Sequence, residues 1–325
     1  MNKVIRIGTR ESQLAVWQAE LVQQLLAKNN IKGELVFIKT EGDIDLQTPL
    51  YEIGVQGIFT RSLDTALINS KIDIAVHSMK DVPTQLATGI AQAAVLQRAS
   101  YKDIFVYKGE FSSISEQLGF VNGEWSMVNN APLTTHYSPL TIATSSVRRM
   151  AQWLNRYPTH SIENLRGNVN TRLRKVTESN WNGAIFAAAG LERINLRPKN
   201  AIELDWMLPA PAQGAIMVVC RTEDHFSLEV CNQLNDADTA ICTKIERDFL
   251  RALLGGCTTP ISALAEIKDN KIYFKGNILT PDGKQKLAIE KIIEKDAFNT
   301  AGKILGEEIL NMGGDKIVQQ IRNAK

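Results

Sequence analysis

The sequence predicts an α/β protein built from two similar lobes and a smaller C-terminal α+β domain. Over residues 4–96, short apolar segments typical of strands alternate with helical patterns, as in a mostly parallel α/β sheet. A strand end followed by hydroxyl residues, arginine and a helix occurs at 7–13 and again at 142–149, which indicates an internal repeat. From Ala237 onward the pattern changes to a helix followed by alternating strands, which predicts a separate domain.

The length and composition are those of a multidomain globular protein. A chain of 325 residues is too long for one compact core and suits two or three domains. Its 44% hydrophobic and 22% charged residues are ordinary values for a soluble protein. The N-terminal segment lacks the apolar core of a signal peptide, and no stretch is apolar enough to span a membrane, so we expect a cytoplasmic protein without membrane contact. A net charge of +2 argues against a general nucleic-acid surface.

The first lobe begins with a predicted strand at 4–7 and a turn that leads into a helix, for which Ser12 is the expected N-cap. A strand-to-helix junction presents free backbone N–H groups, so Arg10 beside it indicates an anion site. Further along, the sequence predicts strands at 35–39, 74–76 and 90–96 and a helix around 61–69.

Residues 73–83, DIAVHSMKDVP, are the strongest candidate for chemistry in this lobe. A buried strand is followed within a few positions by Lys80 and Asp81, before Pro83 ends regular structure. Ligands of open α/β sheets bind beyond the carboxyl ends of strands, which favours a functional role for both residues. The alternative is a solvated turn with a local Lys80–Asp81 ion pair.

The second lobe begins at the predicted strand 103–107 and contains the repeated motif at 142–149. Residues 184–190 resemble the second strand end of the first lobe. Residues 111–139 are rich in Ser, Asn, Thr, Gly and Pro and show too little periodicity to assign, as in loops that are functional or mobile.

The C-terminal region begins with a helix that carries Ile241, Ile245, Phe249 and Leu253 on one face and ends at the glycines 255–256. Three strands follow, separated by turn signals typical of antiparallel hairpins, and a helix closes the chain; the expected ranges are 261–267, 271–279, 286–293 and 297–310.

Arginines are concentrated at the predicted junctions of strands and loops rather than on helix faces. Guanidinium groups bind carboxylates or phosphates at two points, so such a cluster indicates a polyanionic ligand. The alternative is a set of solubilising surface residues, but glycine and asparagine beside arginine in 165–172 favour close approach of the backbone to an anion. The residues concerned are Arg10, Arg148, Arg149, Arg166, Arg172 and Arg193.

Four cysteines lack the spacing of a zinc site or a disulfide framework. Cys220, Cys231 and Cys242 lie in strand or helix patterns, where we expect small buried side chains. Cys257 is different, because it follows two glycines on a predicted loop where a thiol can be reached. No histidine lies close to Cys257 in the sequence, so a thiol hydrolase would need a distant base such as His77. The other use of such a thiol is covalent attachment of a group.

Taken together, these motifs resemble those of the porphobilinogen deaminase (hydroxymethylbilane synthase) family over nearly the full chain. The order of HSMKDVP, LRGNVNTR and GGC is the most specific part of the resemblance. The motifs that carry it lie at residues 9–12, 48–50, 73–83, 144–149, 165–172, 209–215 and 255–257.

The resemblance implies two lobes like type II periplasmic binding proteins, joined by two crossings, and a C-terminal α+β domain. The implied limits are 1–99 with 215–234 for the first lobe, 103–209 for the second and 237–325 for the third. It also implies a monomer and the absence of a bound metal.

By the same resemblance, Cys257 carries a dipyrromethane cofactor through a thioether, and Asp81 is the catalytic carboxylate. Four porphobilinogen molecules are joined stepwise with loss of ammonia, and hydrolysis releases the linear tetrapyrrole. A carboxylate suits this chemistry because loss of ammonia leaves an electron-poor azafulvene that it can stabilise. The implied contacts to cofactor or substrate are Arg10, Ser12, Lys80, Thr144, Ser146, Arg148, Arg149, Arg166, Arg172 and Arg193.

The sequence differs from the family pattern in two places, and one alternative function remains open. Glu52 and Gln56 stand where family members often carry lysines, so a charge-assisted contact worth roughly 1.5–3 kcal/mol is expected to be missing, with Arg61 as a partial substitute. The segment 111–139 is longer than the usual family connection. The alternative function is a non-catalytic, two-lobed binding protein for a carboxylated ligand, which would need neither Cys257 nor the third domain.

Overall fold

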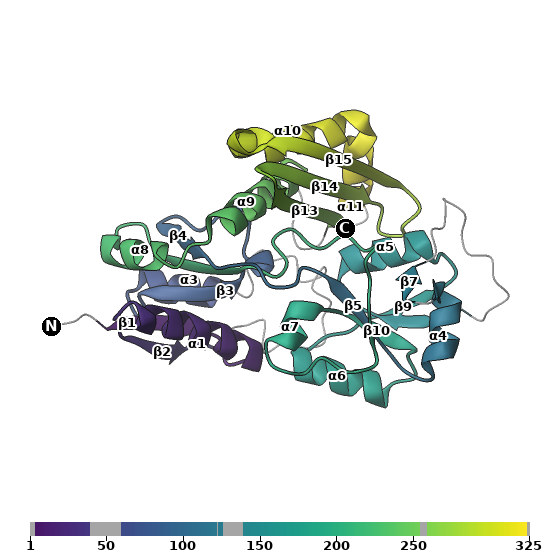
Figure 1. Ribbon diagram of the computed structural model, residues 1–325, viewed down its shortest axis with the longest axis horizontal. Coiled ribbons are helices and arrows are strands. Elements are labelled where there is room, and N and C mark those ends of the chain that lie inside the picture. The colour runs from purple at the N-terminus through teal and green to yellow at the C-terminus, as the bar shows by residue number, and fades with distance from the viewer. Residues whose placement is uncertain (1–3, 40–59, 122, 126–138, 254–258, 324–325) are drawn as a thin grey trace.

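The computed structural model describes residues 4–39, 60–121, 123–125, 139–253 and 259–323. These residues form two five-stranded sheets, a three-stranded sheet and a two-stranded ribbon. In Figure 1 the two lobes lie side by side, and the C-terminal domain sits above the region where they meet. The predicted architecture of two α/β lobes and a C-terminal α+β domain is confirmed. None of the helices in the described ranges is long and apolar enough to cross a membrane.

The first lobe is a sheet with the strand order β2-β1-β3-β12-β4. Helices cover both of its faces, because its strands are apolar on both sides: side chains from α1 and α8 pack on one face and those from α3 on the other. The elements are β1 (Ile5–Thr9), α1 (Gln13–Lys28), β2 (Gly33–Phe37), α3 (Arg61–Ile68), β3 (Ile74–Ser78), β4 (Ile90–Val95), β12 (Ile216–Arg221) and α8 (His225–Asn232).

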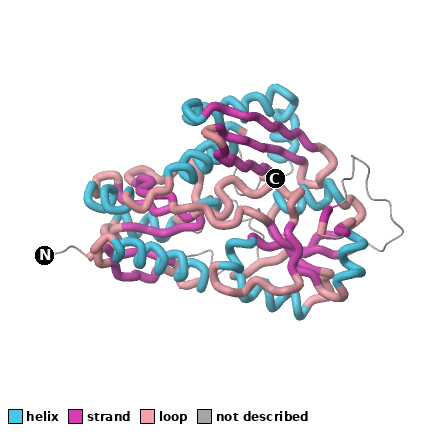
Figure 2. Tube along the Cα trace, viewed as in Figure 1, coloured by secondary structure: helices cyan, strands magenta, loops and turns pink. Residues whose placement is uncertain are grey.

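The second lobe is a sheet with the order β11-β5-β10-β8-β9. Figure 2 shows its strands at the centre with helices around them. A large aromatic and aliphatic core, centred on Phe105 and Trp153, fills one face. The elements are β5 (Asp103–Tyr107), α4 (Phe111–Leu118), β8 (Thr141–Ala143), α5 (Val147–Arg156), β9 (Ser161–Glu163), α6 (Val169–Glu178), β10 (Gly183–Ala187), α7 (Ala188–Glu192) and β11 (Ala201–Glu203).

Both lobes share one topology, as the internal repeat predicted. In the first sheet β12 is antiparallel to both of its neighbours while β1 pairs in parallel with β2 and β3. In the second sheet β5 is antiparallel to its neighbours while β8 pairs in parallel with β9 and β10. Each reversed strand is the one that the chain enters after crossing between lobes, through residues 96–102 to β5 and through 204–215 to β12. The mostly parallel sheet expected from the sequence is therefore confirmed.

The C-terminal domain packs a helical layer on an antiparallel sheet, with strand ranges close to those predicted. Its core includes Ile245 and Phe249 from α9 and Phe274 from β14. The elements are α9 (Ala237–Ala252), β13 (Ile261–Lys268), β14 (Lys271–Leu279), β15 (Lys286–Glu294), a 3₁₀ turn (Lys295–Ala297), α10 (Phe298–Ile309), a π-helical turn (Leu310–Gly314) and α11 (Asp315–Asn323). The glycines predicted to end α9, and Cys257 after them, lie outside the described residues.

Two regions differ from the sequence prediction. The segment 111–139, which the sequence analysis left unassigned, contains α4 and a ribbon of β6 (Phe120–Val121) and β7 (Glu124–Trp125). Helix α4 ends at Gly119, which has the left-handed conformation (φ 67°). A serine-rich helix of eight residues and strands of two are too short to produce a clear period. At the other end, a second helix, α11, follows the single closing helix that was expected.

Glu246 on α9 connects the C-terminal domain to both crossings. Its fully buried carboxylate accepts hydrogen bonds from the Arg98 guanidinium at 2.6 and 3.0 Å and from the backbone N–H of Ala212 at 2.6 Å. It also accepts from the N–H of Ala265 on β13 at 2.8 Å. Arg98 belongs to the first crossing and Ala212 to the second, so one side chain holds three segments together.

We expect Glu246→Ala to lower the free energy of unfolding by about 3–5 kcal/mol, because it leaves the buried Arg98 charge and two backbone donors without their acceptor. Thermal or urea unfolding of the two proteins measures the difference. Glu178→Ala is the matched control, since Glu178 forms an exposed pair with Arg174. Equal stability losses in the two variants would contradict the role assigned to Glu246.

Candidate functional site

A cavity of about 330 Å³ lies between the lobes, and the C-terminal domain contributes Leu250, Thr259 and Ile261 to its wall. The first lobe contributes the turns after β1 and β3, and the second lobe contributes the ends of β8 and β10 and the start of α6. Among the described residues, the charged groups that line it are six cations and one carboxylate: Arg10, Lys80, Arg148, Arg149, Arg166, Arg172 and Asp81.

The cavity brings together ten of the residues predicted to form a site: Arg10, Ser12, Lys80, Asp81, Thr144, Ser146, Arg148, Arg149, Arg166 and Arg172. Arg193 is not among the lining residues; its guanidinium donates to the Gly214 carbonyl at 2.7 Å and lies 5.7 Å from the ring centre of Trp17. It therefore links the second lobe to the second crossing and to α1. Cys257, Glu52 and Gln56 lie outside the described residues.

Asp81 and Lys80 reach the cavity on a 3₁₀ turn (Met79–Asp81) that directly follows β3. The turn is held by the Met79 N–H, which donates to the Ala215 carbonyl at 3.0 Å, and by the Val82 N–H, which donates to the Met79 carbonyl at 3.1 Å. Within the described parts of the chain, the Asp81 carboxylate has no hydrogen-bond or ion-pair partner. Its charge is therefore available to a ligand.

Lys80 differs from an ordinary surface lysine. Desolvation lowers its pKa to about 8, and the nearby charges of Arg149 and Arg148 act in the same direction, while Asp81 opposes them. The ammonium group is thus charged below about pH 8 and increasingly neutral above it. In the charged state it adds a point-like donor for carboxylates next to Asp81.

The turn between β1 and α1 places Arg10 and Ser12 in the cavity wall, at the same edge of the sheet as the turn after β3, because β1 and β3 are parallel neighbours. Ser12 occupies the N-cap position of α1, as predicted, but its side chain makes no capping hydrogen bond. The end of β3 is tied to α1 instead by Gln18, whose amide donates to the Ser78 hydroxyl at 2.9 Å. The Ser12 hydroxyl faces the cavity without a structural task in capping the helix.

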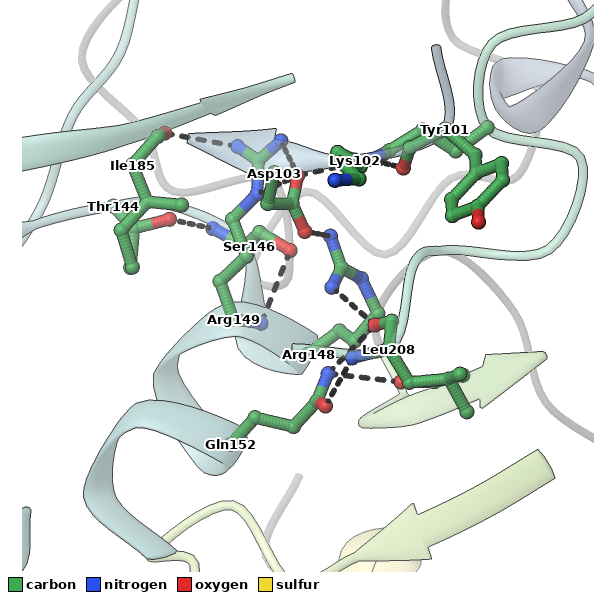
Figure 3. Close-up of polar contacts among 12 residues, drawn as sticks. Tyr101, Lys102, Asp103, Thr144, Ser146, Arg148, Arg149, Gln152, Ile185 and Leu208 are labelled. Atoms are coloured by element: carbon green, nitrogen blue, oxygen red, sulfur yellow. Dashed lines mark hydrogen bonds and ion pairs between the residues drawn. The ribbon is translucent and has the colours of Figure 1, made fainter. Parts of the chain in front are cut away.

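In the second lobe, Arg148 and Arg149 at the start of α5 converge on Asp103, the first residue of β5 (Figure 3). Arg148 donates to one carboxylate oxygen at 2.7 Å and Arg149 donates to the other at 2.8 and 3.1 Å. The side-chain amide of Gln213 donates to the same carboxylate at 2.9 Å. One further nitrogen of each arginine donates to a carbonyl, Arg148 to that of Leu208 at 2.8 Å and Arg149 to that of Ile185 at 3.0 Å.

Burial alone would raise the pKa of Asp103, but the charges of Arg148 and Arg149 and their hydrogen bonds outweigh it and hold the pKa at about 2. The ionised carboxylate fixes both guanidinium groups at the cavity wall. The buried Nε of Arg148 has no hydrogen-bond partner among the described residues. Sequence reasoning missed Asp103, although an aspartate that opens an otherwise apolar strand is a usable signal.

Thr144 and Ser146 arrange the start of α5. The Ser146 hydroxyl caps the helix by accepting from the Arg149 N–H at 3.5 Å, and the Thr144 hydroxyl accepts from the Ser146 N–H at 3.2 Å (Figure 3). Both hydroxyl groups also belong to residues that line the cavity. The motif predicted at 142–149 thus forms the N-terminus of helix α5, which faces the cavity.

The motif at 165–172 leads into and begins α6, so Arg172 lies on a helix, whereas the sequence analysis placed it at a junction of strand and loop. Asn168 caps the helix by accepting from the Thr171 N–H at 3.0 Å. Gly167 has φ 115°, and a Cβ there would lie 2.7 Å from the Thr171 side chain, so glycine is required. Arg172 Nε donates to the Gly167 carbonyl at 2.7 Å, and desolvation lowers the pKa of Arg172 to about 10.

The three cysteines predicted to be structural are buried. Desolvation raises the pKa of Cys220 to about 11 and the pKa values of Cys231 and Cys242 to about 12, so these thiols stay protonated. Burial, together with the charge of Arg10, lowers the pKa of His77 to about 4 and keeps it neutral. No group of three or more potential metal ligands occurs in the described ranges.

Comparison with known proteins gives full-length matches. The model described as porphobilinogen deaminase, dipyromethane cofactor binding domain, matches residues 5–229, and the one described as porphobilinogen deaminase, C-terminal domain, matches 240–311. Porphobilinogen deaminase of Chlorobium phaeobacteroides is 36% identical over 99% of both chains, and that of Acidithiobacillus ferrooxidans is 36% identical over 100% of both. The solved structure of the methionine binding protein MetQ overlaps with a TM-score of 0.41 at 15% identity, covering 73% of this chain and 91% of MetQ.

We expect Asp103→Asn to reduce the free energy of unfolding by about 3–5 kcal/mol at pH 7, because two buried arginines lose their counter-charge. The folded-state pKa of about 2 lies below the ordinary 3.8, so the contribution of Asp103 is present above about pH 4 and is lost as the pH falls toward 2. The difference in unfolding free energy between wild type and variant should therefore narrow by roughly 2 kcal/mol across this range.

The matched control for this prediction is Asp205→Asn, which removes an exposed carboxylate that pairs with Lys102 at 2.7 Å. It should change stability little at any pH. A stability gap between wild type and Asp103→Asn that stays constant from pH 7 to pH 2 would contradict the assignment.

Proposed function

The chain belongs to the porphobilinogen deaminase family, and from this premise we propose that it joins four porphobilinogen molecules stepwise onto a dipyrromethane cofactor. Each step releases ammonia, and hydrolysis finally releases the linear tetrapyrrole hydroxymethylbilane. The observation that carries the proposal is the Asp81 carboxylate, which faces a cavity lined by six cationic side chains. Such a site suits a ligand with many carboxylates and a reaction in which positive charge develops at one point.

The charge of the cavity fits the substrate and the cofactor. Each pyrrole unit carries an acetate and a propionate arm, so several linked units present a row of carboxylates. Guanidinium groups bind carboxylates at two points, and Arg148 and Arg149 are held in place by Asp103 rather than by flexible contacts. A preset arrangement reduces the entropy lost when the ligand binds.

The residues present also fit the dipyrromethane group. The unpartnered Nε of Arg148 and the hydroxyl groups of Thr144 and Ser146 offer donors for its carboxylate arms, with Arg166 and Arg172 beside them. When bound, the cofactor supplies the pyrrole carbon onto which the new units are joined. The second-lobe wall would hold the arms, which leaves the first-lobe turn with Asp81 to act on the incoming substrate.

Asp81 has the properties that departure of ammonia requires. As the aminomethyl group of porphobilinogen loses ammonia, positive charge spreads to the pyrrole nitrogen, and a fixed carboxylate close by stabilises that charge. The same carboxylate can accept a hydrogen bond from the pyrrole N–H and so orient the ring. Lys80, charged below about pH 8, would bind a carboxylate arm of the same unit.

Cys257 is the proposed attachment point of the cofactor. Leu250 and Thr259, which precede and follow it in the sequence, both line the cavity. A non-catalytic binding protein would share the arginines but would need neither this cysteine nor the third domain.

We expect the purified protein to exceed its sequence-derived mass by two linked pyrrole units, because the thioether survives denaturation. Cys257→Ala should lose the excess and the activity while remaining folded, whereas the buried Cys242→Ala should retain both. Intact mass spectrometry under denaturing conditions measures this. If wild type has no excess even after incubation with porphobilinogen, the proposed cofactor chemistry is wrong.

We expect Asp81→Asn to keep the bound cofactor but to lower kcat about 10²- to 10³-fold, as when one preorganised stabilising group is removed. The measurement is the rate of porphobilinogen consumption and ammonia release by cofactor-loaded protein. Asp205→Asn is the matched control, because Asp205 is an exposed carboxylate that is not among the lining residues. Near-normal turnover in Asp81→Asn would remove Asp81 from its proposed role.

A further inference from the structure

Arg247 on α9 contacts the backbone of the turn that carries Asp81, and it is not among the residues that line the cavity. Its buried guanidinium donates to the carbonyls of Met79 at 3.3 Å, Val82 at 2.8 Å and Pro83 at 2.6 Å. These three carbonyls surround the positions of Lys80 and Asp81 in the sequence. One side chain of the C-terminal domain thus holds the backbone of the first-lobe turn from both ends.

The turn depends on this contact for geometric reasons. The last carbonyls of a helical turn lack partners within the turn, and Pro83 has no N–H with which to continue it. The Asp81 carboxylate has no partner of its own in the described parts of the chain, so the backbone decides where the carboxylate points. A planar guanidinium with several fixed donors is suited to hold three carbonyls at once.

The neighbouring residue fixes the position of α9 itself. Glu246 is bound to both crossings through Arg98 and the Ala212 N–H, and to β13 through the Ala265 N–H. Helix α9 lies between the first lobe and the C-terminal sheet, in contact with β4 and β13 (Figure 1). The same helix leads to Cys257, ten positions after Arg247 in the sequence.

We propose that Arg247 is a positioning residue that sets the place of the Asp81 carboxylate relative to the cofactor-bearing domain. The inference rests on the proposed function and adds a residue outside the cavity lining to it. Arg247 touches neither substrate nor cofactor in this proposal; it acts through the backbone of residues 79–83.

The test compares Arg247→Met and Arg247→Lys with the control Arg251→Met, all in cofactor-loaded enzyme. Arg251 is on the same helix, but it is exposed and pairs with Asp248 at 3.1 Å. We expect Arg247→Met to keep the cofactor mass and the KM for porphobilinogen while kcat falls roughly 10- to 100-fold, the scale of a small misplacement of a catalytic group. Arg247→Lys, with fewer donors, should fall between Arg247→Met and wild type, and Arg251→Met should match wild type.

A double substitution separates positioning from a general structural role. If Arg247 acts through Asp81, adding Arg247→Met to Asp81→Asn should lower kcat less than about threefold further, whereas independent effects would multiply. Should Arg247→Met not fold, the same comparison with Arg247→Lys decides the question.

Three results would overturn the inference: unchanged kcat in a folded Arg247 variant, multiplying effects in the double variant, or an effect confined to KM. An inactive wild-type protein that takes up no porphobilinogen would instead overturn the proposed function. An active wild type with fully active Arg247 variants would leave the proposed function standing and refute only the role of Arg247.

Discussion

The burial of the Glu246 carboxylate is the constraint on which the arrangement of the three domains depends. A carboxylate removed from water must have its acceptor positions filled by well-placed donors. Glu246 obtains them from Arg98 on one crossing, Ala212 on the other and Ala265 on β13, so these three segments must meet at one point. Arg98 extends the contact by donating through Nε to the Gln213 carbonyl at 2.8 Å.

A continuous set of hydrogen bonds leads from this point to the cavity. The side-chain amide of Gln213 donates to the Tyr101 carbonyl and to Asp103, and Asp103 holds Arg148 and Arg149 (Figure 3). The crossings are thus joined both to the C-terminal domain and to the cationic wall. This arrangement keeps several positive charges in one small volume, where their mutual repulsion is offset by two fully buried carboxylates.

Helix α9 unites the parts that the proposed reaction requires. Its apolar face anchors the C-terminal core through Ile245 and Phe249, while Glu246 binds the two crossings and Arg247 binds the first-lobe turn. The helix therefore joins the two crossings to the Asp81 turn. Sites on such rigid elements keep their geometry better than sites on free loops.

The sequence by itself determined most of the strand and helix pattern, apart from α4, β6, β7 and α11, together with the repeat of the two lobes and the hairpins of the third domain. These features depend on local periodicity and turn residues. Only the tertiary structure decided the partners of the buried charges, because Asp103 and Arg148 are 45 positions apart and Arg98 and Glu246 are 148 apart. For the same reason, only the tertiary structure showed that Arg193 joins the lobes and does not line the cavity. It also showed that Arg247 contacts the Asp81 turn.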